Sequence, residues 1–413
     1  MRSPFHRPRP RTVAIGAFAL LLVAAPFVPR GGGDDGSLLP SGDETGARTA
    51  AETAGNGTVT PALQAEIDRV VAEGRTVGRV SARVTPSRLA ADLVRCADFE
   101  GQRYCLGSGW TEDTQSEVQA RTAAAARTVA ARRTTATTDT GDLDALGVLR
   151  REAALSPADR ATAQREELTQ AARSVAKVWL LRHEIEGVAL PAGFLARHPE
   201  ARATTTAGAT TGARTAAPRT KRLGDYPSSA AVMSTRRVAE QERTYYCGPT
   251  TMQMIAWGWT GTQRSQSYWA GRLGTTTDGT GLSDMVRVVN DATGWDSASR
   301  AGTYVPLDVG DYSYAQWKLL LMRHIADYHA PLVLHPILLK KYYPYLDDDA
   351  SGHFQVGRGY DKAGRRPTQI GYFEPWNQQR FDPSEPYISR VQWRGAYKSY
   401  RANLEHFQHN IGV

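Results

Sequence analysis

Cys247 is the residue of this 413-residue chain whose surroundings best suit covalent chemistry. Pro249 lies two positions later, where the first turn of a helix tolerates proline, and the apolar residues Met252 and Ile255 follow at helical spacing. A helix is therefore predicted to begin at Cys247. The free N–H groups and the positive dipole end of a helix start favour a thiolate, so this cysteine is a candidate nucleophile. The alternative is a small buried core cysteine that only begins a helix.

Gln241 precedes this cysteine in the segment Gln-Glu-Arg-Thr-Tyr-Tyr-Cys247. A side-chain amide at this place could join the backbone N–H of Cys247 in binding the oxyanion of a tetrahedral intermediate. A glutamine before a helix is usually only hydrated, so this assignment depends entirely on the cysteine that follows. We predict that the two residues form an oxyanion hole.

A nucleophilic thiol needs a base, and the chain offers nine histidines. His353 follows a loop, Leu346-Asp-Asp-Asp-Ala-Ser-Gly352, and opens the segment His-Phe-Gln-Val-Gly-Arg-Gly-Tyr, in which apolar residues alternate as in a strand. His324, His329 and His335 have helical or apolar surroundings instead. His353 is therefore the predicted base.

A third residue is needed to orient the imidazole. The strand that begins at His353 is predicted to pair with residues 368–374 across a turn at 361–364. With the turn centred on its Ala-Gly step, His353 and Glu374 lie opposite each other, close enough for their side chains to touch. A carboxylate bonded to one ring nitrogen fixes the tautomer that faces the thiol. Asn377 is the alternative orienting residue, because an amide can serve in the same role.

Three motifs together resemble the C39-like peptidase family: Cys247-Gly-Pro-Thr after an upstream Gln241, Gly-His353-Phe-Gln-Val-Gly-Arg-Gly-Tyr-Asp, and a later acid before proline. The resemblance covers roughly residues 226–381 and implies a papain-like fold with Cys247 as nucleophile, Gln241 in the oxyanion hole and His353 as base. The family's acid is usually Asp before Pro, whereas this chain has Glu374-Pro375. Members fused to exporters cut leader peptides after paired glycines; this sequence has no transporter or nucleotide motif, so that specificity is not expected.

The other two cysteines are predicted to form a disulfide. Cys96 and Cys105 flank Ala-Asp-Phe-Glu-Gly-Gln-Arg-Tyr, whose Glu100-Gly101 is typical of a turn. Their side chains could meet across a short hairpin, which leaves Cys247 free. A disulfide fits an oxidising compartment outside the cytosol.

The first 29 residues favour export. Several arginines precede an apolar run from Val13 to Val28, after which a Gly-rich stretch begins. This arrangement is typical of a secretory signal peptide. The run is short for a membrane span and contains Gly16 and Pro26, so an uncleaved membrane anchor is the alternative. We expect a secreted protein that meets a membrane only through this segment.

Composition divides the remaining chain. Residues 201–220 are of low complexity and lack large apolar side chains, whereas most of the tryptophans follow them. We predict an α+β fold in which a papain-like cysteine peptidase domain has a helix bearing the cysteine and an antiparallel sheet bearing the histidine, preceded by a small disulfide-containing region and linkers. The predicted ranges are a signal peptide at 1–29, a disordered stretch at 30–61, a small disulfide-stapled unit at 62–114, an Ala/Thr-rich linker at 115–155, a helical segment at 156–200, a linker at 201–220 and a C39-like cysteine peptidase domain at 221–413.

Within the helical segment, a helix is predicted from the cap residue Ser156, which precedes Pro157, to near Glu186, where Gly187 stops it. Because the linker has too few apolar residues to contribute to a core, a chain truncated to begin near Lys221 is expected to fold alone.

Charge and ligand patterns argue against other classes of protein. The 50 basic and 42 acidic residues give a net charge of +8 that is scattered along the chain, so no nucleic-acid partner is predicted. Glu405, His406 and His409 share a helix-like face, but two imidazoles without further ligands are more often surface residues than a zinc site. Neither a metal nor a cofactor is predicted.

These residues together predict a secreted cysteine peptidase, a thiol hydrolase that cuts peptide or amide bonds through an acyl-enzyme. Its partners would be peptide or protein substrates, including cell-wall-associated ones. Two alternatives remain: a cell-wall amidase or transpeptidase that uses the same Cys/His pair, and a non-catalytic peptide-binding homologue.

Overall fold

The computed structural model describes residues 57–132, 139–201, 220–234, 236–293, 304–343, 346, 349–362, 369–373, 375 and 390–413. Contacts divide the chain into two units, Met1–Ser37 and Leu38–Val413, and every described residue belongs to the second. The predicted signal peptide, most of 30–61 and all but the ends of 201–220 lie outside the described residues. Among the described helices, none is long and apolar enough to cross a membrane. Below, the N-terminal region means 57–201 and the C-terminal region 220–413.

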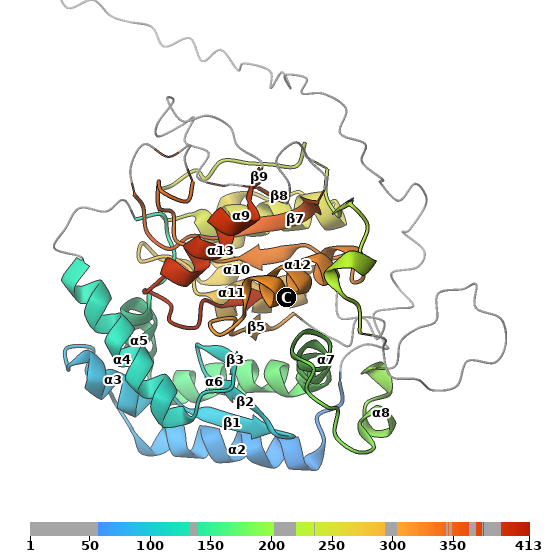
Figure 1. Ribbon diagram of the computed structural model, residues 1–413. Helices are drawn as coiled ribbons and strands as arrows, with labels where there is room; N and C mark the ends of the chain where they lie inside the picture. Colours follow the sequence, from blue (N-terminus) through green and yellow to red (C-terminus); the bar gives the residue numbers. More distant parts are fainter. Residues whose placement is uncertain are drawn as a thin grey trace, which may run out of the picture. The chain divides into compact units, whose positions relative to one another are not determined.

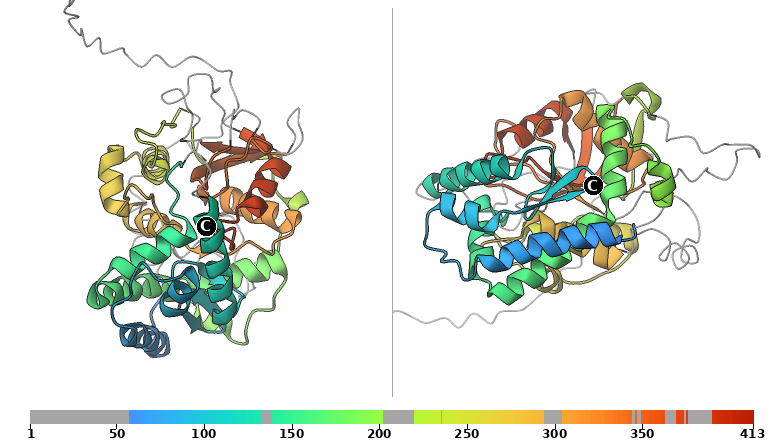
Figure 2. Two further views of the ribbon diagram at one scale, coloured as in Figure 1. Left: turned by 90° about the vertical axis from the view of Figure 1, so that its left-hand side faces the viewer. Right: turned by 90° about the horizontal axis from the view of Figure 1, so that it is seen from below.

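The N-terminal region begins with two capped helices, α2 (Pro61–Thr76) and α3 (Pro86–Leu93). The side chains of Thr60 and Thr85 accept hydrogen bonds from backbone N–H groups in the first turn, and each helix has a proline there. Helix α2 packs along α6, Pro157–Arg173 (Figure 2). The apolar side of α2 is buried at Leu63, Ile67, Val70 and Val71.

The first two strands, β1 (Cys96–Phe99) and β2 (Gln102–Cys105), form the predicted hairpin. The turn between them places Glu100 at φ 50° and Gly101 at φ 83°, in the left-handed region that glycine adopts readily. Cys96 pairs with Cys105 across the strands, and the two are joined by a disulfide. Cys247 is the free cysteine.

Helices occupy most of the stretch from 115 to 197, including much of the part predicted as a linker. The predicted helix from Ser156 is divided into two by Ser174, and Gly187, at φ 79°, ends the second of them as predicted. The helices here are α4 (Gln115–Arg132), α5 (Ala145–Ala154), α6, α7 (Val175–Glu186) and α8 (Phe194–Arg197), followed by a 3₁₀ turn at Pro199–Ala201.

The C-terminal region contains helices that flank the longer strands. Helix α9 (Cys247–Ile255) begins at the predicted residue and runs into a π-helical turn, Ala256–Thr260. The others are a 3₁₀ turn at Leu223–Asp225, α10 (Gln266–Leu273), α11 (Leu282–Thr293), α12 (Tyr314–Ala326) and α13 (Trp393–Ala402).

One sheet joins the two regions. Its described strands follow the order β1-β2-β3-β5-β10-β6-β7-β8-β9, and β4 also pairs with β7. The strands β3 and β5 lie side by side (Figure 1) and pair in parallel through Trp110 and Leu307, whereas the other pairs are antiparallel. The remaining strands are β3 (Gly109–Thr111), β4 (Ser229–Ala231), β5 (Pro306–Leu307), β6 (Leu332–Leu334), β7 (Gln355–Asp361), β8 (Gln369–Phe373), β9 (Arg390–Gln392) and β10 (Ile411–Gly412).

The hairpin of β7 and β8 forms as predicted, but its register differs. Val356 pairs with Phe373, whereas the predicted turn centre would have set Val356 against Gly371. At the other end Asp361 pairs with Gln369, and a bulge lies between the two ends. The predicted register was therefore wrong by two residues near His353. Gly and Asp mark a turn but do not fix its length, and a bulge adds a residue that no count from the turn can foresee.

Candidate active site

The nucleophile candidate begins the helix that the sequence assigned to it. Cys247 is the first residue of α9, and its side chain is 0% exposed. The next residue, Gly248, lies so close to Thr280 that an added Cβ would be 2.5 Å from the Thr280 hydroxyl. The helix start is therefore held tightly against the chain at Thr280.

The electrostatics of the thiol differ from the sequence expectation. Burial raises the pKa of the Cys247 thiol well above its usual value, and the charge of Asp142 raises the pKa further. Hydrogen bonds from the backbone N–H groups of Phe354 and Gly248 act in the opposite direction. The helix start alone would favour the thiolate, but in this arrangement burial has the larger effect and favours the neutral thiol.

The two predicted oxyanion donors converge on one oxygen. The backbone N–H of Cys247 and the Nε2 amide of Gln241 each donate to the carbonyl of Thr140 at 3.3 Å. The Gln241 amide is itself buried and also donates to the carbonyls of Arg243 and Thr244, which fix its direction. The two donors therefore form a pre-organised site for a carbonyl oxygen.

The predicted base lies on the chain segment that contacts the thiol. His353 is buried and precedes Phe354, whose backbone N–H reaches the Cys247 sulfur. The hydroxyl of Thr251, on α9, donates to the Phe354 carbonyl at 3.2 Å, and the backbone N–H of His353 donates to Pro336 at 2.9 Å. The Thr251 bond holds the residue before β7 against α9, and so brings the cysteine and histidine segments together although they are far apart in the sequence.

The two candidates for the orienting role, Glu374 and Asn377, lie outside the described residues. Between them Pro375 is described, and its carbonyl accepts a hydrogen bond from the backbone N–H of Gln241 at 2.9 Å. The chain after β8 therefore returns to the site, although the register that paired His353 with Glu374 is not the one formed. Both assignments remain predictions.

The structure adds a buried group of residues that the sequence did not reveal. Asp142 contacts the Nε2 atoms of His335 and His406, one with each carboxylate oxygen, both at 2.8 Å. The carboxyl pKa of Asp142 is lowered: burial alone would raise it, but the two imidazoles outweigh burial. The expectation that His406 is a surface residue was wrong, because Asp142 comes from the stretch predicted as a linker and no local signal marks it as its partner.

This group has the donor types that a divalent cation uses, and its ligand atoms lie within 4.8 Å of one another. The other ring nitrogen of His335 lies 2.8 Å from the Asn410 side-chain oxygen, which fixes the imidazole from behind. The two contacts between Asp142 and the imidazoles, at 2.8 Å, have the length of direct hydrogen bonds.

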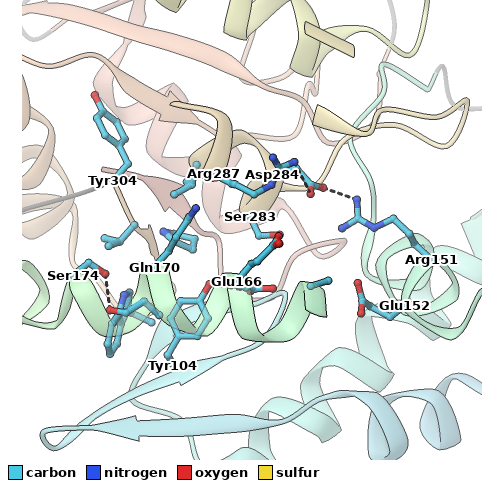
Figure 3. A pocket seen from close by; sticks show the side chains of 17 residues that line it. Tyr104, Arg151, Glu152, Glu166, Gln170, Ser174, Ser283, Asp284, Arg287 and Tyr304 are labelled. Carbon is cyan, nitrogen blue, oxygen red and sulfur yellow. Dashed lines mark hydrogen bonds and ion pairs between the residues drawn. The ribbon is translucent and has the colours of Figure 1, made fainter. Parts of the chain in front are cut away.

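A separate small pocket, of about 100 Å³, lies between α6 and α11 (Figure 3). Arg151 and Asp284 form an ion pair at 2.5 Å at its edge, and Tyr104, Gln170 and Ser174 lie on its other side (Figure 3). Cys247 and His353 are not among its lining residues. The pocket therefore marks where the two regions pack together and not the candidate site.

Comparison with known proteins agrees with the resemblance. Residues 235–403 match the model of the Peptidase_C39 like family, and this span contains Gln241, Cys247 and His353. No curated protein and no solved structure matches the chain. The match to the C39-like peptidase family falls in the C-terminal region of this protein, while the N-terminal region, including Thr140 and Asp142, lies outside it.

Proposed function

We propose that this protein is an exported cysteine peptidase that cuts peptide or amide bonds through an acyl-enzyme. The family assignment supports a peptidase, and the observation that carries the proposal is the convergence of two N–H donors on one carbonyl oxygen beside Cys247. A core cysteine that only begins a helix has no need of a second, side-chain donor buried beside it. The arrangement suits acyl transfer, in which such donors hold the developing oxyanion.

The proposed reaction assigns one step to each residue. His353 takes the proton from the Cys247 thiol, and the thiolate attacks the substrate carbonyl carbon. Gln241 and the Cys247 N–H hold the oxyanion until the C–N bond breaks and the leaving amine takes the proton from His353. Water, deprotonated by His353, then attacks the thioester and releases the acid and the free thiol. Glu374, or alternatively Asn377, would orient the imidazole.

An electrophilic peptide probe tests this proposal directly. We expect mass spectrometry to find the probe on Cys247 of the full chain, no adduct in Cys247→Ala, and labelling at least ten times slower in His353→Ala. His183→Ala is the matched control, because His183 lies on α7 outside the family match and bonds the Val188 carbonyl. Equal labelling of His353→Ala and the control would remove His353 from the mechanism.

Product analysis then separates the acyl-transfer alternatives. The same acyl-enzyme would serve a cell-wall amidase or transpeptidase, so peptidoglycan fragments and plain peptides are supplied side by side. Release of free carboxylates from plain peptides supports a peptidase. Products that form only from peptidoglycan, or that carry a transferred acyl group, would assign the site to the cell-wall reactions.

Export is part of the same proposal. The apolar run between Val13 and Val28 supports it, as does the disulfide between Cys96 and Cys105, which is stable in oxidising compartments. Fractionation of cells that produce the full chain should recover a shortened protein outside the cytosol. Recovery of the full-length chain in the cytosol with Cys96 and Cys105 reduced would contradict export.

A further inference from the structure

The carbonyl oxygen in the oxyanion site belongs to the protein's own chain. It is the oxygen of Thr140, in the segment Asp139–Leu143, hereafter the threaded segment. This segment belongs to the N-terminal region and lies about a hundred residues before Cys247 in the sequence. Thr140 and Cys247 are both 0% exposed, so the thiol has no access to solvent while the segment is in place.

The backbone of the threaded segment pairs with the site as an added strand would. The N–H of Thr280 donates to the Gly141 carbonyl and the N–H of Leu143 donates to the Thr280 carbonyl, both at 2.9 Å. On the other side, the N–H of Thr140 donates to the Ser351 hydroxyl at 3.0 Å. Main-chain pairing of this kind is a general mode of peptide recognition.

The Thr140 side chain is also bound. Its hydroxyl donates to the carbonyl of Gly352 at 2.8 Å, in the loop directly before His353. Thr140 is therefore held at two points: its carbonyl accepts from the proposed oxyanion donors, and its hydroxyl bonds the loop that precedes His353. This position fits a small side chain with a hydroxyl group.

The residue after the bound carbonyl must be glycine. Gly141 has φ +102°, and an added Cβ would lie 2.3 Å from the backbone carbon of Tyr245. Gly279 faces it so closely that a Cβ there would lie 2.3 Å from the Gly141 oxygen. Rigid backbone surrounds this position, so a larger residue cannot bind without moving the segment away.

Asp142 anchors the segment beyond the glycine. Its carboxylate reaches His335 and His406, both in the C-terminal region and both nearly completely buried. Three successive residues of the segment therefore meet different surroundings. The Thr140 hydroxyl is hydrogen-bonded, Gly141 lies where there is no room for a Cβ, and the Asp142 carboxylate contacts two imidazoles.

We propose that the threaded segment occupies the substrate site as an internal peptide ligand, with the Thr140–Gly141 bond where Cys247 would attack a substrate. This inference rests on the proposed function and names its substrate class: peptides in which a small hydroxyl residue, glycine and aspartate follow one another. Access for any other peptide requires the segment to leave.

The same geometry defines a self-cleavage step. Attack of Cys247 on the Thr140 carbonyl breaks the C–N bond to Gly141, whose nitrogen takes the proton that His353 received from the thiol. Water then hydrolyses the thioester. The products are a Thr140 carboxylate, a Gly141 amine and the free thiol, so atoms and protons balance.

Release of the segment is tested by the rate at which the electrophilic peptide probe labels Cys247 in the full chain. Gly141→Ala should label at least ten times faster than wild type, because the new Cβ displaces the segment. Gly187→Ala is the matched control, since Gly187 also has a positive φ, +79°, but an added Cβ there meets nothing within 4 Å. Asp142→Asn, which keeps the size of the side chain, should also accelerate labelling if Gly141→Ala fails to fold.

Equal labelling rates in wild type and the folded variants would overturn the internal ligand while leaving the proposed function intact. No labelling in any folded variant would remove the proposed function and this inference with it. As a second measurement, the synthetic peptide Asp-Thr-Gly-Asp-Leu should slow labelling of Gly141→Ala, whereas the peptide with alanine for glycine should not. Equal protection by both peptides would contradict the glycine position.

Intact mass and N-terminal sequencing locate the attacked bond. A fragment that begins at Gly141 in wild type and is absent from Cys247→Ala supports the placement of the bond. A Cys247-dependent cut at any other bond in the threaded segment would overturn that placement.

Discussion

The N-terminal and C-terminal regions differ in how their sequence relates to the site. The C-terminal region carries the recognisable motifs of a cysteine peptidase and contains the whole family match. The N-terminal region carries capped helices and a disulfide hairpin, yet it supplies the carbonyl that accepts from Gln241 and Cys247 and the carboxylate that contacts the two buried histidines. Sequence motifs therefore identify the candidate catalytic residues Gln241, Cys247 and His353, but they do not identify Thr140 and Asp142, which contact this part of the structure.

The two regions also depend on each other for their packing. The sequence predicted that the chain from Lys221 folds alone. The structure instead pairs β3 with β5 and joins the regions through Thr111 and Asp308, Arg151 and Asp284, and Glu186 and Tyr312. Removal of the N-terminal region would expose the apolar edge at Leu307 and leave the half-buried carboxylates of Asp284 and Asp308 without their partners.

Truncation should have the largest effect on the protein. A chain that begins at Lys221 should show no cooperative thermal transition, because each large apolar side chain uncovered costs about 1.5–3 kcal/mol. Co-expression of residues 57–201 should restore a soluble complex. Circular dichroism of the two preparations decides the matter: a sharp transition in the truncated chain alone would restore the original prediction of an independent domain.

Removal of the side-chain oxyanion donor tests the machinery of the C-terminal region. Gln241→Ala should lower kcat by roughly a hundred- to a thousandfold with little change in KM, because the donor acts mainly in the transition state. Gln253→Ala is a matched control on α9, where the amide donates to the Arg264 carbonyl. A rise in KM at constant kcat would show that Gln241 only binds substrate.

The orienting residue is expected to have a graded effect. Glu374→Gln keeps size but removes the charge that stabilises the imidazolium, so a loss of about tenfold to a thousandfold in kcat is expected. Asn377→Ala should then be close to wild type. Steady-state kinetics of the two variants would reverse the assignment if Glu374→Gln were silent and Asn377→Ala inactive.

The contact between the regions at Asp142 predicts a weaker, pH-dependent effect. Burial alone would lower the pKa of His406, but the charge and hydrogen bond of Asp142 outweigh it, so this pKa is raised above the usual 6.5. A raised pKa gives stability that is fully present below pH 6.5 and lost as the pH rises through the folded value. At pH 5.5 His406→Gln should unfold more easily than wild type by roughly 1.5 to 3 kcal/mol.

Denaturant unfolding from pH 5.5 to 9 measures this difference. The gap between wild type and His406→Gln should shrink as the pH rises, because the imidazole loses its charge in wild type as well. The Asp142 carboxyl, whose pKa is lowered, stays charged throughout this range. A gap that is constant or grows with pH would show that the His406 contact does not depend on the imidazolium.

The elements that carry the candidate residues could be predicted from the sequence because their signals are local. Proline in the first turn and the helical spacing of apolar residues placed Cys247 at the start of α9, and a loop followed by alternating residues placed His353 just before β7. The same local signals gave the hairpin at Glu100-Gly101 and the helix stop at Gly187. In each case the residues that determine the feature lie within a few positions of it.

The tertiary structure decided what depends on contacts between distant segments. The register of β7 and β8 depends on a turn length and a bulge that local residue types do not fix, and the pKa of Cys247 depends on burial that overrides the helix start. Thr140 and Asp142 carry no local mark of their role. Only the packing of the N-terminal region against the C-terminal region brings Thr140 to the N–H donors of Gln241 and Cys247, and Asp142 to the two histidines. The physical reason is that a hydrogen bond or an ion pair depends on distance in space and not on distance along the chain.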